Sequence, residues 1–159
     1  MENVETLARG ARAEEKKANH LRVTFVSPPF DNVKKGHGSK RTGVRYGFWA
    51  PYGAALLSAI IKKMGHEFSF IDAPATGCIN DDILQELSET RPDVIGISAL
   101  LATQDEVIDL ARRIRKKAKL NVPVFLGGLL ATTFGEQIMG DVPEIDYAVV
   151  GEAEETVRE

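Results

Sequence analysis

The most constraining feature of this sequence is a pair of short apolar runs, one with a serine near its end and the other followed by two glycines. The first, residues 94–100, is too short for a helix and rich in β-branched side chains, so it is predicted to be a strand buried on both faces. The second, residues 123–126, is a similar strand that runs into Gly127 and Gly128. The carboxyl ends of parallel strands form the edge where open α/β sheets bind ligands. We therefore expect Ser98 and the two glycines to lie side by side at a ligand-binding edge.

The rest of the chain alternates strand and helix patterns. Further strands are predicted at residues 21–27, 67–72 and 146–150, and apolar stripes at helical spacing follow at residues 51–64, 81–90, 107–118 and from 133 onward. Five strands, each followed by a helix, predict an α/β fold built on a doubly wound, five-stranded parallel sheet.

Polar residues at the expected helix starts resemble known caps. Thr103 with Glu106, and Thr133 with Glu136, have the spacing of capping boxes, in which each side chain bonds the other residue's backbone N–H. Asn80 is the expected N-cap of the helix after the second strand. These signals predict helices that begin at about residues 81, 104 and 133.

Composition limits the class of protein. A chain of 159 residues with 43% hydrophobic content fits one domain, and residues 1–20 are a charged extension expected to be helical and solvated or disordered. The net charge of −3 gives no general attraction to nucleic acid or anionic membranes, and no run is long enough for a transmembrane span. Cys78 is the single cysteine, which excludes an internal disulfide and suits a reducing cytoplasm.

The spacing of the strand-end residues points to a family. Ser98-Ala99-Leu100 followed by Gly127-Gly128 resembles the second and third signatures of the cobalamin-binding domains of B12-dependent mutases and methionine synthase, but the first signature, Asp-x-His-x-x-Gly, is missing. A wider resemblance, to the amino-terminal B12-binding domain of radical SAM enzymes, explains that gap because this subfamily commonly lacks the histidine. It rests on residues 23–29, 63–66, 91–98, 126–128 and 146–152.

The resemblance implies a Rossmann-like cobalamin-binding fold with the flavodoxin-like strand order 2-1-3-4-5. The domain would span residues 21–159, and we expect it to be cut before or within its last helix. A radical SAM cluster needs three thiolates and Cys78 is alone. The iron–sulfur cluster and SAM would therefore belong to a radical SAM domain elsewhere in a longer protein or in a partner chain, where methyl transfer or related radical chemistry takes place.

The resemblance also implies a set of cofactor-binding residues. The glycines would leave room for the flat dimethylbenzimidazole tail, since a side chain there would block it, the Ser98 hydroxyl would donate to the tail's ring nitrogen, and Leu100 would pack near the corrin. The full expected set is Ser98, Leu100, Thr103, Gly127, Gly128, Gly151 and Glu152.

The cobalamin is expected to be base-off with no protein histidine on cobalt. His37 lies in the matching loop but has Lys35, not an aspartate, two residues before it, so nothing would orient its imidazole. His20 and His66 fall outside that loop, at the opposite end of the expected sheet.

Other functions remain open or are disfavoured. A degenerate domain that keeps the fold, binds no corrinoid and serves as a docking module is the alternative function. The basic segment 30–50 is expected to be either a lid over the corrinoid or a mobile surface loop. The cations at 112–117 are interpreted as a solvated helix face. Receiver, flavodoxin and dinucleotide-binding signatures are absent, as is a Cys/His cluster for zinc.

Overall fold

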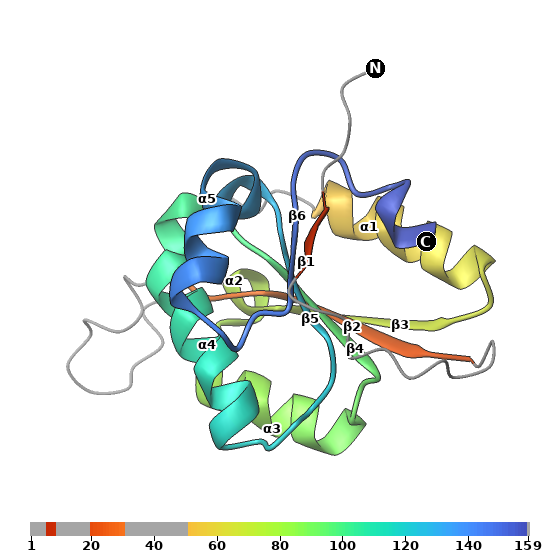
Figure 1. Ribbon diagram of the computed structural model, residues 1–159. Helices are drawn as coiled ribbons and strands as arrows, with labels where there is room; N and C mark the ends of the chain where they lie inside the picture. The colour runs from red at the N-terminus through yellow and green to blue at the C-terminus, as the bar shows by residue number, and fades with distance from the viewer. Residues whose placement is uncertain (1–5, 9–19, 31–50, 159) are drawn as a thin grey trace.

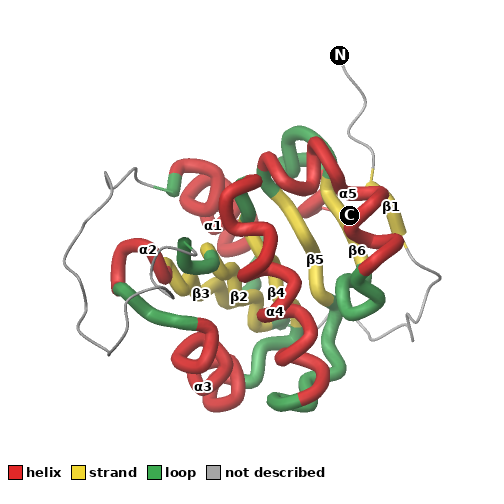
Figure 2. The backbone as a smooth tube through the Cα atoms, turned by 90° about the vertical axis from the view of Figure 1, so that its left-hand side faces the viewer, coloured by secondary structure: helices red, strands yellow, loops and turns green. Residues whose placement is uncertain are grey.

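One sheet forms the centre of the molecule. The computed structural model describes residues 6–8, 20–30 and 51–158, with only the backbone described for 6–8. In these ranges the strands stand in the order β1-β6-β5-β4-β2-β3, which Figure 2 shows from right to left. Their bounds are β1 Thr6–Ala8, β2 Arg22–Ser27, β3 Glu67–Asp72, β4 Val94–Ser98, β5 Val124–Gly127 and β6 Tyr147–Val149. Strands β2 to β6 pair in parallel, so the predicted five-stranded parallel sheet and its 2-1-3-4-5 order are confirmed.

Helices cover the two faces of the sheet unequally. The helical segments are α1 Tyr52–Lys63, α2 Ala73–Thr76, α3 Asn80–Thr90, η2 Leu101–Thr103, α4 Gln104–Lys116, α5 Leu129–Asp141 and η3 Thr156–Arg158. Helices α3, α4 and α5 lie on one face, and α1 with η3 lies on the other (Figure 1). The face under α1 and η3 is therefore the less covered one.

Alternation along the central strands separates a core face from an open face. Ile95 and Ile97 of β4 and Leu126 of β5 are buried under α3–α5, and each such side chain stabilises the fold by about 1.5–3 kcal/mol. The intervening residues, among them Gly96 and Phe125, point to the opposite face because successive side chains of a strand alternate.

The capping box predicted for Thr103 and Glu106 is wrong. Thr103 Oγ1 instead accepts from the Leu100 N–H at 3.2 Å and donates to the Leu100 carbonyl at 2.9 Å, which closes the turn η2. Glu106 is 1% exposed, and its carboxylate accepts from Asn80 Nδ2 at 3.2 Å. Asn80 is thus the first residue of α3, buried against α4, and not the predicted N-cap.

Helix α5 begins earlier than its sequence signal. It starts at Leu129, and Thr133 Oγ1 donates to the Leu129 carbonyl at 2.8 Å within the helix. The backbone then leaves helical geometry at Phe134, with φ −133°. The predicted start at Thr133 is wrong, although the irregularity falls one residue later.

The amino-terminal extension contributes a strand. Thr6–Ala8 pair antiparallel with Tyr147–Val149 at the outer edge of β6, where a helical or disordered segment was expected. The pairing depends on the exposed edge of β6, whose unpaired backbone groups can bond any nearby chain. A local sequence pattern therefore does not predict it. The remainder of residues 1–19 lies outside the described residues.

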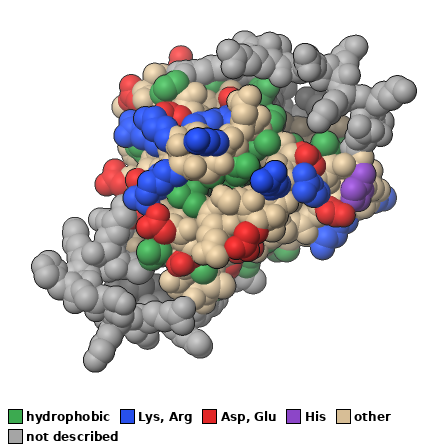
Figure 3. All heavy atoms as spheres, turned by 90° about the horizontal axis from the view of Figure 1, so that it is seen from below, with side chains coloured by type: hydrophobic (Ala, Val, Ile, Leu, Met, Phe, Trp, Pro, Cys, Tyr) green, Lys and Arg blue, Asp and Glu red, His purple; other side chains and the backbone are tan. Residues whose placement is uncertain are grey.

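The cations of α4 are largely paired. Arg113 contacts Asp81 and Asp109, Arg115 contacts Asp146, and Lys116 lies 3.5 Å from Glu144. Figure 3 shows acidic side chains next to the basic ones on this side of the molecule. This pairing supports the interpretation of a solvated helix face.

Among the described helices, none has the length and apolar character needed to cross a membrane.

Candidate functional site

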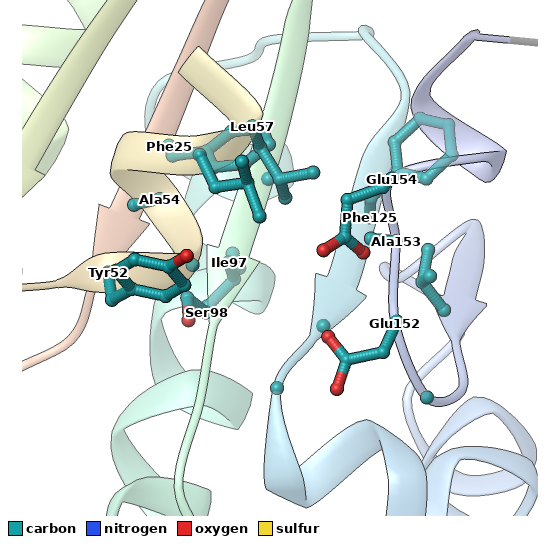
Figure 4. A pocket seen from close by; sticks show the side chains of 17 residues that line it. Phe25, Tyr52, Ala54, Leu57, Ile97, Ser98, Phe125, Glu152, Ala153 and Glu154 are labelled. Atoms are coloured by element: carbon teal, nitrogen blue, oxygen red, sulfur yellow. The ribbon is translucent and has the colours of Figure 1, made fainter. Parts of the chain in front are cut away.

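A pocket lies on the open face of the sheet, between α1 and residues 151–154 (Figure 4). Its volume is about 210 Å³. Phe25 of β2 and Phe125 of β5 contribute to its floor, together with Gly96 between them, and Tyr52 and Leu57 of α1 form one wall. Strand β2 lies between β3 and β4, so the strand order reverses beside it, and this is the topological switch point of the fold. The pocket lies at this point.

The aromatic floor is held in place by its neighbours. A Cβ atom at Gly96 would lie 2.6 Å from the Phe25 ring, so the glycine lets this ring lie over β4. Phe25 also packs edge-to-face on Phe68, with centroids 5.1 Å apart, and Phe125 stacks on Tyr147 at 4.5 Å. A flat ligand would therefore meet a preformed aromatic surface.

Most of the predicted site residues come together in this pocket. Ser98 and Gly127 are paired across β4 and β5, and the lining includes Ser98, Gly127, Gly128, Gly151 and Glu152. Leu100 and Thr103 are not among the lining residues. Leu100 is 50% exposed at the same sheet edge, and Thr103 is buried with its hydroxyl bonded to Leu100.

The two adjacent glycines lack side chains for different reasons. At Gly127, nothing lies within 4 Å of the position that a Cβ atom would take, so a side chain there would extend into open space at the pocket. At Gly128, φ is +81° and a Cβ would lie 2.7 Å from the Ala99 carbonyl oxygen. Gly127 therefore keeps the pocket open, whereas Gly128 allows the backbone to turn tightly from β5 into α5.

Gly151 turns the chain back across the pocket. Its φ is +78°, and its N–H donates to Thr132 Oγ1 of α5 at 3.1 Å. The turn brings Glu152 and Glu154 to the wall opposite α1.

Sequence reasoning missed several lining residues. Phe25, Tyr52, Phe125 and Glu154 were not among the expected set, yet all four line the pocket. Phe25 and Phe125 could have been found from alternation, because each lies an even number of positions from a strand-end residue of the open face. Tyr52 and Glu154 lie on segments whose approach to the sheet has no such local signal.

The described histidines lie at the amino ends of the strands, at the end of the sheet opposite the pocket. His20 Nδ1 is 2.6 Å from the Gly65 carbonyl oxygen and Nε2 is 3.0 Å from Glu67, whose carboxylate raises the pKa of His20. His66 Nδ1 accepts from the Leu21 N–H at 3.4 Å. His37 lies outside the described residues, as does most of the basic segment 30–50. Among described residues, no group of three or more His, Cys, Asp or Glu could hold a metal ion.

Comparison with known proteins gives a consistent family and fold. The sequence matches the family described as B12 binding domain over residues 38–159. It is 30% identical over 141 residues to the anaerobic magnesium-protoporphyrin IX monomethyl ester cyclase of Cereibacter sphaeroides, covering 86% of this chain and 21% of that protein. An uncharacterized methyltransferase of Pyrococcus horikoshii is also 30% identical, over 140 residues that cover 87% of this chain and 28% of the relative. The chain thus spans between a fifth and a third of the length of these relatives.

Two solved structures share the fold. The cobalamin-dependent S-adenosylmethionine radical enzyme OxsB with aqua-cobalamin bound superposes with a TM-score of 0.68 at 18% identity, over 89% of this chain and 18% of that one. The radical S-adenosylmethionine methyltransferase TsrM from Kitasatospora setae gives a TM-score of 0.64 at 19% identity, over 84% and 24%.

Proposed function

This chain belongs to the B12-binding domain family, and from that premise we propose that it holds the cobalamin of a radical SAM enzyme, with the nucleotide tail in the pocket between α1 and residues 151–154. The observation that carries the proposal is the open position at Gly127, beside the Ser98 hydroxyl and above the aromatic floor. No hydrogen bond within the described ranges engages that hydroxyl, so it is free to donate to a ligand.

The size of the pocket suits a part of the cofactor. Pockets for whole drug-sized ligands hold roughly 300–1,000 Å³, whereas this one holds about 210 Å³, the scale of a single flat ring system. The much larger corrin would lie outside it, along the carboxyl edge of the sheet. Apolar side chains are exposed in the segments that follow the strands at that edge, namely Ile79, Leu100, Leu101 and Leu129.

The remaining expected residues act by positioning others. Thr103 holds both backbone groups of Leu100 through one hydroxyl, so we assign it the role of fixing Leu100 at the edge. Gly151, through its turn and its bond to Thr132, directs Glu152 toward the tail.

The reaction would take place with a separate domain. Cobalamin, when bound, supplies a cobalt that accepts and donates a methyl group or supports a related radical reaction. The residues of this chain bind and orient it, while the iron–sulfur cluster and SAM belong to a radical SAM domain in a longer chain or a partner, since Cys78 cannot supply three thiolates. The lengths of the relatives and the methyltransferase among them support this division. A cytoplasmic location, suggested by the lone cysteine, is part of the proposal.

Retention of a corrinoid tests the proposal against the docking-module alternative. The protein is incubated with hydroxocobalamin, repurified by gel filtration, and its visible spectrum recorded. We expect the corrinoid bands to travel with the protein. A colourless protein after repurification would favour the docking module.

Replacing Ser98 by alanine should weaken cobalamin binding about fivefold, because the tail's ring nitrogen loses one net hydrogen bond of about 1 kcal/mol. Equilibrium dialysis measures the change. Ser88→Ala is the matched control, since its hydroxyl bonds the Leu84 carbonyl in α3, away from the pocket. Equal affinities for wild type and Ser98→Ala would contradict the assigned role.

Bound cobalamin is expected to be base-off, with no protein histidine as lower ligand. His20 and His66 lie at the end of the sheet opposite the pocket, which leaves His37 as the candidate to test. Electron paramagnetic resonance of the Co(II) form reports the ligand, because a coordinated nitrogen splits each cobalt line into three. Splitting that disappears in His37→Ala would refute the expectation.

A further inference from the structure

We infer that the pocket selects corrinoids by their lower base, and that it binds a base with an amino donor, such as adenine, more tightly than dimethylbenzimidazole. The inference deepens the proposed function and rests on it. It starts from two carboxylates, those of Glu152 and Glu154, on the wall opposite α1.

Both carboxylates are directed toward the cavity. Figure 4 shows the side chains of Glu152 and Glu154 extending from their segment toward the side of the pocket formed by α1 and β4. Glu154 is half-buried, whereas Glu152 is exposed. The nearby Arg158 guanidinium bonds the Glu154 backbone carbonyl and the Glu155 carboxylate, so it does not neutralise either pocket carboxylate. Within the described ranges, no hydrogen bond or ion pair engages these two carboxylates.

The rest of the lining offers few donors. Its described side chains include no Lys, Arg, His, Asn or Gln, and its hydroxyl donors are Ser98 and Tyr52. Most of the remaining surface is apolar. The pocket therefore presents more strong acceptors than its own residues can satisfy, on a wall next to an aromatic floor.

This imbalance discriminates between lower bases. Attached to its ribose, dimethylbenzimidazole has a ring nitrogen that accepts from Ser98 but no N–H to donate. Its binding would remove water from the half-buried Glu154 carboxylate without replacing those hydrogen bonds. Such unmade bonds are costly, and a hydrogen bond to a charged group is stronger than a neutral one. Adenine keeps a ring nitrogen acceptor and a flat ring for Phe25 and Phe125, and adds an exocyclic amine that can donate to Glu152 or Glu154.

The test compares two probes on the intact chain. Hydroxocobalamin and the corrinoid that differs only in carrying adenine as lower base are each titrated into the protein, with affinity measured by equilibrium dialysis and visible absorbance. We expect the adenine form to bind about tenfold more tightly, the scale of one hydrogen bond to a charged acceptor. In Glu152→Ala/Glu154→Ala the preference for the adenine form should disappear.

A neighbouring carboxylate supplies the control. Glu155→Ala removes a side chain that is paired with Arg158 and does not line the pocket, so it should retain the full preference. Equal affinities in the wild type, tighter binding of hydroxocobalamin, or a preference that survives in the double variant would each overturn the inference and leave the proposed function standing. Failure of both corrinoids to bind would overturn the proposed function and this inference with it.

Discussion

Replacing Gly127 by leucine is expected to weaken cobalamin binding strongly while the protein stays folded. The leucine side chain would enter the space that we assign to the nucleotide tail, because nothing lies within 4 Å of the Cβ position. Forcing extra atoms into a filled site costs about 1–3 kcal/mol, so affinity should fall by up to about 100-fold. Equilibrium dialysis with hydroxocobalamin measures the loss, and circular dichroism checks the fold.

A second glycine separates this effect from the substitution itself. Gly140 is exposed near the end of α5, also with nothing within 4 Å of its Cβ position, and it lies outside the pocket. Gly140→Leu should bind cobalamin as the wild type does and be slightly more stable, because leucine is the better helix former. Unchanged binding by Gly127→Leu would show that the tail does not occupy this pocket.

The sheet could be predicted from sequence because its signals are local and repeated. Short β-branched runs separated by helical stripes are sufficient for an α/β fold, and the parallel direction follows from the helical crossovers. Strand order does not follow from periodicity, and here it depended on the family resemblance. The pairing of Thr6–Ala8 with β6 could not be predicted, since a three-residue strand has no period to detect.

The helix starts show where local patterns fail. Thr103 fits a capping box by spacing, but its hydroxyl bonds both backbone groups of Leu100, just past the end of β4. Glu106 is buried, and its carboxylate accepts a hydrogen bond from the Asn80 amide of α3. Both outcomes depend on residues brought together by the tertiary fold, which a local pattern does not contain.

The site was predicted only in part for a similar reason. Ser98 and Gly127 were found because strand ends meet at one edge of a parallel sheet. The opposite wall, with Glu152 and Glu154, comes from a segment whose path is set by the turn at Gly151 and its bond to Thr132. That bond joins residues from different elements, so the sequence around Glu154 gives no indication that it faces a pocket.

Replacing Gly128 by alanine should lower the free energy of unfolding by about 3 kcal/mol. At φ +81° and ψ −168° the residue occupies a region that is essentially restricted to glycine, at a cost of about 1–3 kcal/mol for other residues. The added Cβ would also lie 2.7 Å from the Ala99 carbonyl oxygen. That oxygen cannot easily move away, because it accepts from the Leu130 N–H at 3.1 Å in the first turn of α5.

Urea denaturation followed by circular dichroism measures this loss, and the neighbouring glycine is its control. Gly127→Ala adds the same methyl group at a position without a positive φ and with no atom within 4 Å, so its stability should stay within about 0.5 kcal/mol of the wild type. If Gly128→Ala proved as stable as Gly127→Ala, the tight turn would not require glycine. Gly128 would then have to be explained as Gly127 is, by the space that the nucleotide tail needs. A large loss confined to Gly128→Ala would instead assign the two halves of the Gly-Gly signature to separate roles, one in the fold and one in the pocket.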